Sequence, residues 1–590
     1  MGQLPHNLIF KVQKISIKFH FDFQPNLRNP ISPISTVNST YKRVAVRPTF
    51  SFCFYLSKMV KYIVILCLFV VYCKTEPVTV VTSEGSIQGN RNDGYNTFFG
   101  VPYAKVNEDN PFGNALYHPK FKKPFIANVS TIMCPQVSFN DSGILQCLTL
   151  NIYVPQNANT KKPLPIFVWF HGGGFVFGSA GEYDGQYLVE QDIIVIAANY
   201  RLGAYGFLCL DDPSVPGNQG MKDQIMALRW IKEHIACFGG DPDKITIAGE
   251  SYGGGGVDLH LYSNYEKLFH KAIIQSGSIY ITNGIFVNPD YKAALKLAKY
   301  LGSNATTTRN ALKFLAKAKP VDVNAATRNL SLILTFCKEK KFEGVDNFVT
   351  KDPFHLNKPD RVKNTPIMIG YTSQEMLYQF VNKPQSYYDE IGNVFSTQLQ
   401  KTFVFTKEEL ETLSNITQKF YLGGKAYGPE AQIALTYFAS DFKLNYGVEW
   451  SVNRYIEQGA KVYKYVFSYI GGSEHRNVSG AGAKHTEELK YLFDWIKAKP
   501  LTDDEQLNMR ERMTTMWANF VKYGNPTPEE TDLLPVTWIP VTGAARPYLN
   551  INVRMEMKDH AYKHRIAYWD LFWHVYLKNH SMNLQKCSIS

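Results

Sequence analysis

A serine bounded by glycines is the feature of this 590-residue sequence that points most directly to chemistry. Gly249-Glu250-Ser251-Tyr252-Gly253 follows a β-branched apolar run and precedes residues 253–256, which can open a helix. A strand, a sharp turn and a helix would force Ser251 into a strained, exposed position suited to a nucleophile. The alternative is a plain strand–helix loop, because chance matches to this pentapeptide are frequent.

A second glycine-rich segment, His171-Gly172-Gly173-Gly174-Phe175, directly follows the apolar run 166–170. Residues without side chains let backbone N–H groups approach a developing oxyanion. By itself a glycine triplet is more often a flexible loop. Beside a serine elbow it is the expected second half of an oxyanion hole.

A serine hydroxyl needs a base, and the base needs an acid that orients it. If the acid follows the serine and the histidine comes last, Glu375 and His485 are candidates. Glu375 follows the apolar run 366–369, and His485 ends the loop Gly480-Ala-Gly-Ala-Lys-His485 after the run 462–468. Both would lie at the carboxyl ends of strands. His475 is a rival base and Glu474 a rival acid, and the residues alone leave both open.

The elements that must position these groups alternate along the chain. The runs 166–170, 193–198 and 245–248 lack polar alternation, as expected for parallel strands covered on both faces. Residues 219–234 have helical spacing. Short antiparallel strands are expected within 78–87, and further strands at 272–275, 366–369 and 462–468. The pattern predicts an α/β fold with a large, mostly parallel central sheet flanked by helices.

The formal charge of +12 is concentrated near the N-terminus. Residues 1–58 contain eight Lys or Arg and one acidic residue, and 53 basic against 50 acidic residues follow Lys74. The sequence therefore shows no concentration of basic residues after Lys74 that would indicate nucleic-acid binding. A hydrophobic content of 45% is ample for a large packed core.

The N-terminal residues read as a targeting segment. Met59-Val60-Lys61 precedes the apolar run 62–73, which has the length of a secretory signal and is too short to span a bilayer. We interpret 59–74 as a signal peptide and 1–58 as an upstream extension outside the fold. The alternative is a genuine long N-terminal region with a membrane anchor. No repeat or linker divides the remainder, so 75–590 is expected to be a single domain.

Features after the signal fit an extracellular chain without membrane attachment. Seven sequons offer sites for N-glycans, and they begin at Asn128, Asn140, Asn304, Asn329, Asn415, Asn477 and Asn579. Six cysteines follow Thr75, which are too few for a disulfide scaffold but enough for one or two disulfides.

Taken together, these motifs resemble those of the type-B carboxylesterases, the family of cholinesterases, juvenile-hormone esterases and insect carboxylesterases. The resemblance covers essentially residues 77–570. Further matching stretches are Phe99-Gly-Val-Pro-Tyr-Ala104, Cys147-Leu-Thr-Leu-Asn-Ile-Tyr153, Asn199-Tyr-Arg-Leu-Gly203, Phe238-Gly-Gly-Asp-Pro242, Gln275-Ser-Gly-Ser278 and Gly524-Asn-Pro526. The resemblance implies the α/β-hydrolase fold and hydrolysis of a small ester, without a metal or cofactor.

Carried over residue by residue, the resemblance implies Ser251 as nucleophile, His485 as base and Glu375 as the acid. This removes His475 from contention. The implied oxyanion hole consists of the backbone N–H groups of Gly173, Gly174 and Tyr252.

Some residues depart from the family pattern. Tyr252 replaces the usual alanine, which would narrow the acyl pocket. The resemblance implies a disulfide between Cys134 and Cys147, and the loop that it closes lacks the tryptophan with which cholinesterases bind choline. Glu250 differs from the glutamine usual in juvenile-hormone esterases. Uncharged, fairly apolar esters are therefore the expected substrates.

The remaining cysteines and two other function classes stay open. Cys209 and Cys237 either pair with each other or are two buried thiols. A slow-turnover scavenger would bind esters or organophosphates covalently at Ser251, and a non-catalytic adhesion relative would not react at all.

Overall fold

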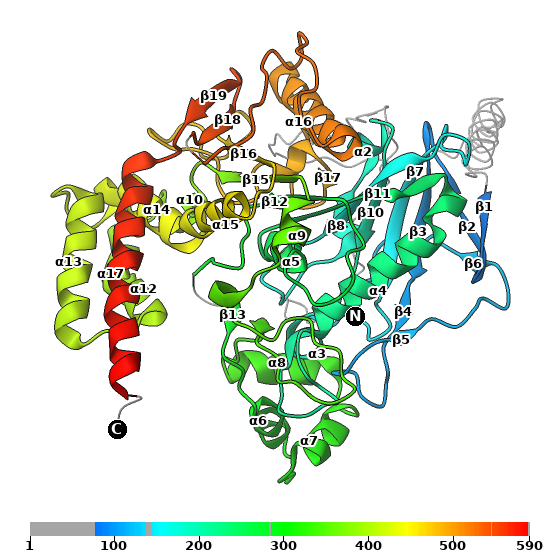
Figure 1. Ribbon diagram of the computed structural model, residues 1–590, viewed down its shortest axis with the longest axis horizontal. Coiled ribbons are helices and arrows are strands. Elements are labelled where there is room, and N and C mark those ends of the chain that lie inside the picture. The colour runs from blue at the N-terminus through cyan, green and yellow to red at the C-terminus, as the bar shows by residue number, and fades with distance from the viewer. Residues whose placement is uncertain (1–76, 137–142, 283–284, 544, 588–590) are drawn as a thin grey trace, which may run out of the picture. The chain divides into compact units, whose positions relative to one another are not determined.

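A thirteen-stranded sheet runs through the computed structural model, which describes residues 77–136, 143–282, 285–543 and 545–587 (Figure 1). Its strands are β1 (Pro77–Thr82), β2 (Gly85–Arg91), β3 (Tyr95–Pro102), β6 (Phe125–Ile126), β7 (Thr149–Pro155), β8 (Leu164–Phe170), β10 (Ile194–Ala198), β11 (Gly240–Glu250), β12 (Lys271–Gln275), β15 (Ile367–Thr372), β16 (Val462–Phe467), β18 (Pro547–Ile551) and β19 (Glu556–Asp559). The predicted extension (1–58) and signal peptide (59–74) lie outside the described residues.

The strand order is β1-β2-β3-β7-β10-β8-β11-β12-β15-β16-β18-β19, with β6 beside β2. All neighbours from β10 to β18 are parallel. The strands β7 and β19 pair antiparallel with β10 and β18 at the two ends of this parallel block. The predicted α/β architecture with a mostly parallel sheet is confirmed.

The predicted elements agree with the observed ones, with one informative difference. The helix expected over 219–234 is α4 (Gln219–His234). By contrast, β11 begins at Gly240, five residues before the predicted strand, and its register with β8 shifts between Gly240 and Ile245. The extra residues are mostly polar, so hydrophobic periodicity could not reveal them.

Both faces of the sheet are covered. In β8, Ile166 and Val168 belong to one core and Phe167 and Trp169 to the other, as the alternation of a strand requires. The first core includes residues of α4 and α5 (Tyr252–His260), and the second includes residues of α16 (Asp504–Tyr523). This double cover explains why the central strands are continuously apolar.

The other helices surround this sheet (Figure 1). They are α2 (Gln186–Val189), α3 (Gly203–Phe207), α6 (Ala293–Tyr300), α7 (Thr308–Leu315), α8 (Pro320–Asn329), α9 (Pro359–Lys363), α10 (Leu377–Phe380), α11 (Gln385–Ile391), α12 (Val394–Thr402), α13 (Lys407–Leu422), α14 (Gln432–Ser440), α15 (Tyr446–Glu457) and α17 (Lys563–Cys587). A π-helical turn, Asp441–Asn445, joins α14 to α15. Over the described residues, no helix combines the length and hydropathy that a membrane span requires.

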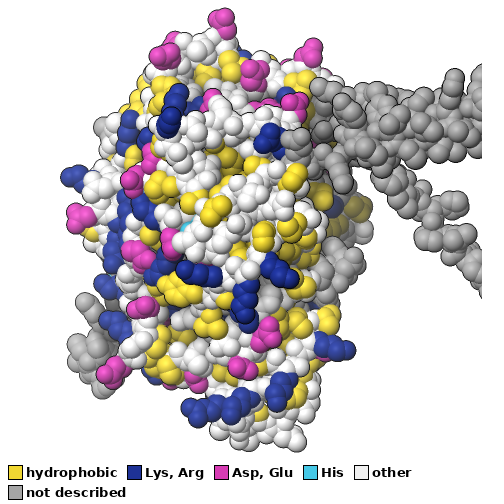
Figure 2. Space-filling model, turned by 90° about the vertical axis from the view of Figure 1, so that its right-hand side faces the viewer, with side chains coloured by type: hydrophobic (Ala, Val, Ile, Leu, Met, Phe, Trp, Pro, Cys, Tyr) yellow, Lys and Arg dark blue, Asp and Glu magenta, His cyan; other side chains and the backbone are white. Residues whose placement is uncertain are grey.

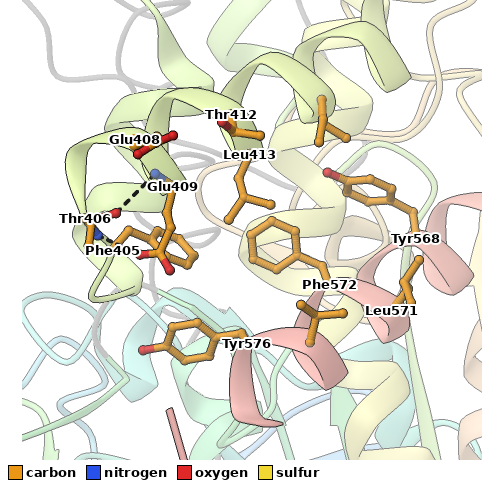
Figure 3. Close-up of a pocket in the computed structure, with 12 residues that line it drawn as sticks. Phe405, Thr406, Glu408, Glu409, Thr412, Leu413, Tyr568, Leu571, Phe572 and Tyr576 are labelled. Carbon is orange, nitrogen blue, oxygen red and sulfur yellow. Dashed lines mark hydrogen bonds between the residues drawn. The ribbon is translucent and has the colours of Figure 1, made fainter. Parts of the chain in front are cut away.

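The helix α17 packs against α13, which begins with a capping box. The Thr406 hydroxyl accepts a hydrogen bond from the Glu409 N–H, and the Glu409 carboxylate accepts one from the Thr406 N–H. Between the helices lies an apolar groove of about 660 Å³. Its lining includes Phe405, Leu413 and Phe572 (Figure 3).

The outer surface is mixed in character. On the face shown in Figure 2, Lys and Arg side chains are spread among acidic and apolar ones. Five sequon asparagines, Asn128, Asn304, Asn329, Asn415 and Asn477, are exposed. Asn140 lies outside the described residues, and the side chain of Asn579 is not described.

Candidate active site

Ser251 occupies a sharp turn between β11, which ends at Glu250, and α5, which begins at Tyr252. Its backbone has φ 57° and ψ −126°, a left-handed conformation that residues other than glycine rarely adopt. The Ser251 N–H donates a hydrogen bond to the Gln275 carbonyl at 2.8 Å, which ties the turn to β12. The predicted strand–turn–helix geometry around Ser251 is confirmed.

The glycines of the elbow are needed because the backbones approach closely. A Cβ atom on Gly253 would lie 2.1 Å from the Phe170 carbonyl oxygen. A Cβ atom on Gly249 would lie 2.6 Å from the Gly253 carbonyl group. Any larger residue would therefore push the helix away from the sheet and displace the serine.

A hydrogen-bonded chain joins the three predicted triad side chains. His485 Nε2 lies 3.0 Å from Ser251 Oγ, and His485 Nδ1 lies 2.6 Å from Glu375 Oε2. Because a carboxylate only accepts, Nδ1 carries the proton and Nε2 is left to accept from the Ser251 hydroxyl. The imidazole is thus oriented to remove the serine proton.

Glu375 is fully buried and held by other donors. The Ser276 hydroxyl and the Thr372 N–H donate to its Oε1 at 2.6 and 2.8 Å, which leaves Oε2 for His485. The His485 N–H also donates to the Glu375 carbonyl at 3.1 Å. The pair is therefore fixed by β15, by the loop after it and by Ser276, which follows β12.

The rival pair lies apart from this arrangement. Glu474 Oε1 is 3.6 Å from His475 Nε2 and 2.6 Å from the Lys484 ammonium group. The hydrogen bond from Lys484 lowers the pKa of Glu474. Among the described residues, no hydrogen bond joins His475 to Ser251, so the structure brings His485 and not His475 to the serine.

The glycine-rich loop after β8 lies directly against the elbow. A Cβ atom on Gly172 would be 2.8 Å from Glu250 Oε2 and 3.0 Å from Ser251 Cβ. Gly173 and Gly174 have φ values of 100° and 66°, which favour glycine. Over the described part of the chain, the N–H groups of Gly173 and Gly174 have no acceptor.

Tyr252 contributes the third predicted donor. As the first residue of α5, its N–H belongs to the initial helical turn and needs an acceptor outside the helix. The N–H groups of Gly173, Gly174 and Tyr252 can thus serve an oxyanion formed beside Ser251.

Hydrogen bonds and ring stacking of His171 and Tyr200 hold the glycine-rich loop in place. The Tyr200 hydroxyl donates to the His171 carbonyl at 2.5 Å, and the two rings stack with centroids 4.5 Å apart. Burial lowers the pKa of His171 to about 4, so the ring is neutral and its Nδ1 donates to the Gly172 carbonyl at 2.9 Å. The loop is consequently positioned by buried hydrogen bonds.

Two buried carboxyl groups beside the base had received no role from the sequence. Glu250 Oε1 lies 3.1 Å from His485 Nε2, and Glu488 Oε1 accepts a hydrogen bond from Gln275 Nε2 at 3.2 Å. Burial raises the pKa of Glu250 to about 7, opposed by His485 and reinforced by Glu375. Burial, together with Glu250 and Glu375, raises the pKa of Glu488 to about 8. The sequence could have pointed to both, because Glu250 directly precedes Ser251 and Glu488 lies three residues after His485.

These groups titrate as one coupled cluster. Burial alone would lower the pKa of His485, but Glu250, Glu375 and Glu488 outweigh it and raise this pKa above its usual range. The raised pKa favours the imidazolium that forms when His485 takes the serine proton.

An aromatic cluster lies next to the nucleophile. The Tyr252 ring meets Phe175 edge-on with centroids 5.1 Å apart, and Phe175 contacts Phe336 at 4.7 Å and Phe207 at 4.4 Å. The three phenylalanines are buried, so they pack behind the Tyr252 ring.

Both expectations for Cys209 and Cys237 are wrong. Cys209 forms a disulfide with Cys337, 128 residues later, and Cys237 is a free, exposed thiol. Gly217, at φ 119°, packs against the bond, since a Cβ atom there would lie 2.5 Å from Cys337 Sγ. The partner comes from the short strand β14 (Phe336–Cys337), far along the chain, so proximity along the chain was misleading. The disulfide between Cys134 and Cys147 is present, as the resemblance implied.

Comparisons with known proteins indicate the family of the chain. The family model described as the carboxylesterase family matches residues 76–569. The chain is 29% identical to the juvenile hormone esterase of Tribolium castaneum, over 76% of this chain and 83% of the relative. It is 30% identical to acetylcholinesterase 4 of Caenorhabditis briggsae, over 76% and 82%, and 28% identical to esterase FE4 of Myzus persicae, over 78% and 86%.

A solved structure extends the comparison to the fold. The crystal structure of juvenile hormone esterase from Manduca sexta, with OTFP covalently attached, superposes with a TM-score of 0.73 at 27% identity. The match covers 85% of this chain and all of that one. The chain therefore belongs to the carboxylesterase family and is a carboxylic-ester hydrolase of the α/β-hydrolase fold.

Proposed function

We propose that the protein is a serine esterase that hydrolyses uncharged, fairly apolar carboxylic esters through an acyl-enzyme on Ser251. The observation that carries the proposal is the continuous chain from Ser251 Oγ through His485 to Glu375, with donor–acceptor distances of 3.0 and 2.6 Å. A strained elbow presents the serine, and a fully buried carboxylate orients the base.

The reaction follows from these positions. Ser251 Oγ attacks the ester carbonyl carbon while His485 Nε2 takes the hydroxyl proton. The N–H groups of Gly173, Gly174 and Tyr252 stabilise the resulting oxyanion. His485 then gives its proton to the departing alcohol. Water, deprotonated by the same nitrogen, attacks the acyl-enzyme and releases the acid.

The walls of the site support the substrate class. The half-buried Tyr252 ring, backed by the buried rings of Phe175 and Phe336, lies next to Ser251 in sequence and brings no charge. The loop between Cys134 and Cys147 contains no tryptophan, so cation–π capture of a quaternary ammonium lacks its main ring. These features favour neutral esters over choline esters.

The proposed location is extracellular. Two disulfides favour an oxidising compartment, and five sequon asparagines are exposed and accessible to glycosylation. Expression in a secreting cell should release a glycosylated protein whose first residue lies near Thr75. Retention in the cell membrane, or a mature chain beginning well before Met59, would contradict this proposal.

The test of the activity compares ester turnover with covalent labelling. The protein, its Ser251→Ala variant and a control variant at an exposed serine, Ser386→Ala, are assayed with p-nitrophenyl acetate and butyrate and with a fluorophosphonate probe. Rapid turnover that only Ser251→Ala abolishes supports the esterase. Labelling without turnover would indicate a scavenger, and the absence of both would indicate an adhesion protein.

A further inference from the structure

A polar pocket of about 520 Å³ lies beside the loop that carries His485. Lys484 and Thr486 line this pocket, whereas Ser251, Glu375 and His485 do not, so it is separate from the proposed catalytic site. Its other walls come from the loop after β16, from β17 (Asp494–Trp495) and the residues after it, and from the first turn of α16. Its volume suits a small organic molecule.

Positive charge exceeds negative charge in the lining of this pocket. The charged lining residues are the acidic Glu474 and Glu487 and the basic Arg476, Lys484, Lys490, Lys497 and Lys499. Both acidic side chains already have a cation, since Lys484 lies 2.6 Å from Glu474 and Lys490 lies 2.6 Å from Glu487. The pocket therefore has no carboxylate left to neutralise its remaining basic side chains.

Two of these cations are available to a ligand. Arg476 and Lys499 are exposed and form no ion pair with any described residue. The Arg476 guanidinium donates one long hydrogen bond, to the Gly471 carbonyl at 3.5 Å. Lys499 lies near the Lys484–Glu474 pair, because its charge adds to the effect of Lys484 in lowering the pKa of Glu474. An anionic group in the pocket would gain charge-assisted hydrogen bonds from both.

The wall also contains polar atoms without partners. Glu487 is 5% exposed, and its Oε1 binds Lys490 while its Oε2 has no donor within the described part of the chain. The indole N–H of Trp495 likewise lacks an acceptor there. Buried polar groups without partners are rare in native proteins. Both atoms are shielded from solvent, so a small side-chain movement has to accompany contact with a ligand.

The neutral part of the lining favours a hydroxylated ligand over a hydrocarbon. Five further lining side chains can donate or accept hydrogen bonds, and they are Ser473, Asn477, Thr486, Thr502 and Gln506. Aliphatic surface is limited to Ala498 and Pro500.

We propose that this pocket binds a sugar-sized, polyhydroxylated molecule that carries a sulfate or phosphate monoester. The ester group would lie between Arg476 and Lys499, whose N–H groups match the oxygens of a tetrahedral anion. The hydroxyl groups of the ligand would donate to Glu487 and accept from Trp495. Binding involves no covalent step and does not depend on the esterase activity.

Glucose 6-sulfate and glucose 6-phosphate are suitable probes. The parent for the titrations is the whole protein with Asn477→Gln, since this sequon asparagine lines the pocket and a glycan on it would compete. Calorimetry at neutral pH should show one molecule of either ester bound, about ten-fold more tightly than glucose or inorganic sulfate. The ester that binds more tightly identifies the anionic group. Glucose or inorganic sulfate that binds as tightly as both esters would overturn the proposal.

A second arm separates this result from the catalytic site. Addition of Ser251→Ala should leave the affinity for both esters unchanged, because Ser251 does not line the pocket. Loss of ester binding in this variant would place the ligand at the proposed catalytic site and contradict the proposal.

Substitution of the two unpaired cations locates the site. The double variant Arg476→Gln/Lys499→Gln should bind both esters about ten-fold more weakly. Both side chains are exposed, so the melting temperature should not change. The matched control, Arg309→Gln/Lys313→Gln, removes an exposed arginine and an exposed lysine from α7 and should bind normally. Unchanged affinity in the pocket variant, or an equal loss in the control, would refute the site.

Trp495→Phe tests the proposed hydrogen bond from the indole. The variant keeps an aromatic ring but lacks the N–H, so the esters should bind about five-fold more weakly. Binding equal to that of the parent would show that the indole N–H takes no part in recognition.

Discussion

The molecule contains two glutamate–histidine pairs, Glu375 with His485 and Glu474 with His475. They differ in burial, in distance and in their other partners. Glu375 is fully buried and 2.6 Å from His485 Nδ1, whereas the Glu474 side chain is 59% exposed and 3.6 Å from His475 Nε2. Lys484 forms an ion pair with Glu474, while the oxygens of Glu375 are shared between His485 and neutral donors.

The comparison shows that residue type and chain position do not make a histidine a base. His485 has the Glu375 carboxylate at Nδ1, and the Ser251 hydroxyl and the Glu250 carboxyl group at Nε2. Both ring nitrogens of His475 are buried without a hydrogen-bond partner among the described residues. The function of His485 is therefore expected to depend on its neighbours.

The largest effect is expected from removal of the base. His485→Ala should lower kcat/KM for p-nitrophenyl butyrate by about 10⁵-fold, because serine then has no proton acceptor. His475→Ala should change it by less than about two-fold, since His475 does not contact the proposed triad. Comparable losses in the two variants would erase the distinction between the pairs.

Substitution of the two glutamates should also affect activity unequally, and the larger loss should be smaller than that of His485→Ala. Glu375→Gln leaves the shape intact but offers Nδ1 an amide in place of a carboxylate, so kcat should fall about 10³-fold or more. The control, Glu474→Gln, loses only an exposed ion pair with Lys484 and should keep full activity. Steady-state kinetics on the purified variants measures both, and an active Glu375→Gln enzyme would contradict the assigned role.

Glu250 should affect the pH dependence more than the rate. Its carboxylate raises the pKa of His485, so Glu250→Gln should lower that pKa and move the acid limb of the kcat/KM profile to lower pH by about one unit. Glu487→Gln serves as a control, because Glu487 is paired with Lys490 at 2.6 Å. A shift toward higher pH would show that Glu250 does not act on the base electrostatically.

The smallest effect concerns stability. The folded-state pKa of Glu488 is raised from 4.5 to about 8, so between these values the folded protein holds a proton that the unfolded chain releases. The unfolding free energy should therefore fall as pH rises through this window, by up to about 1.4 kcal/mol per unit for this group. Glu488→Gln should flatten the dependence in urea unfolding at several pH values. An unchanged slope would mean that Glu488 is not the proton-holding group.

Motif and chain order predicted Ser251 and offered Glu375 and His485 beside their rivals Glu474 and His475, and the family resemblance decided between them. Ser251, Glu375 and His485 each follow an apolar strand, and the carboxyl ends of parallel strands meet at one edge of the sheet. The glycine loop was predictable for the same reason, because it follows β8 directly.

Features that depend on burial or on distant contacts could not be predicted. The elevated pKa values of Glu250 and Glu488 arise from the surrounding core, which no local pattern reports. The partner of Cys209 lies 128 residues away, so only the folded chain shows that it is Cys337. The early start of β11 was hidden because only Gly240 pairs with β8 before Ile245, and the residues between them are mostly polar.

The most direct test of the central claim is the site and rate of covalent modification by a fluorophosphonate, followed by peptide mass spectrometry. A single adduct on Ser251, formed far more slowly in His485→Ala and at the normal rate in His475→Ala, is the predicted result. An adduct on another residue, or an undiminished rate without His485, would contradict the account.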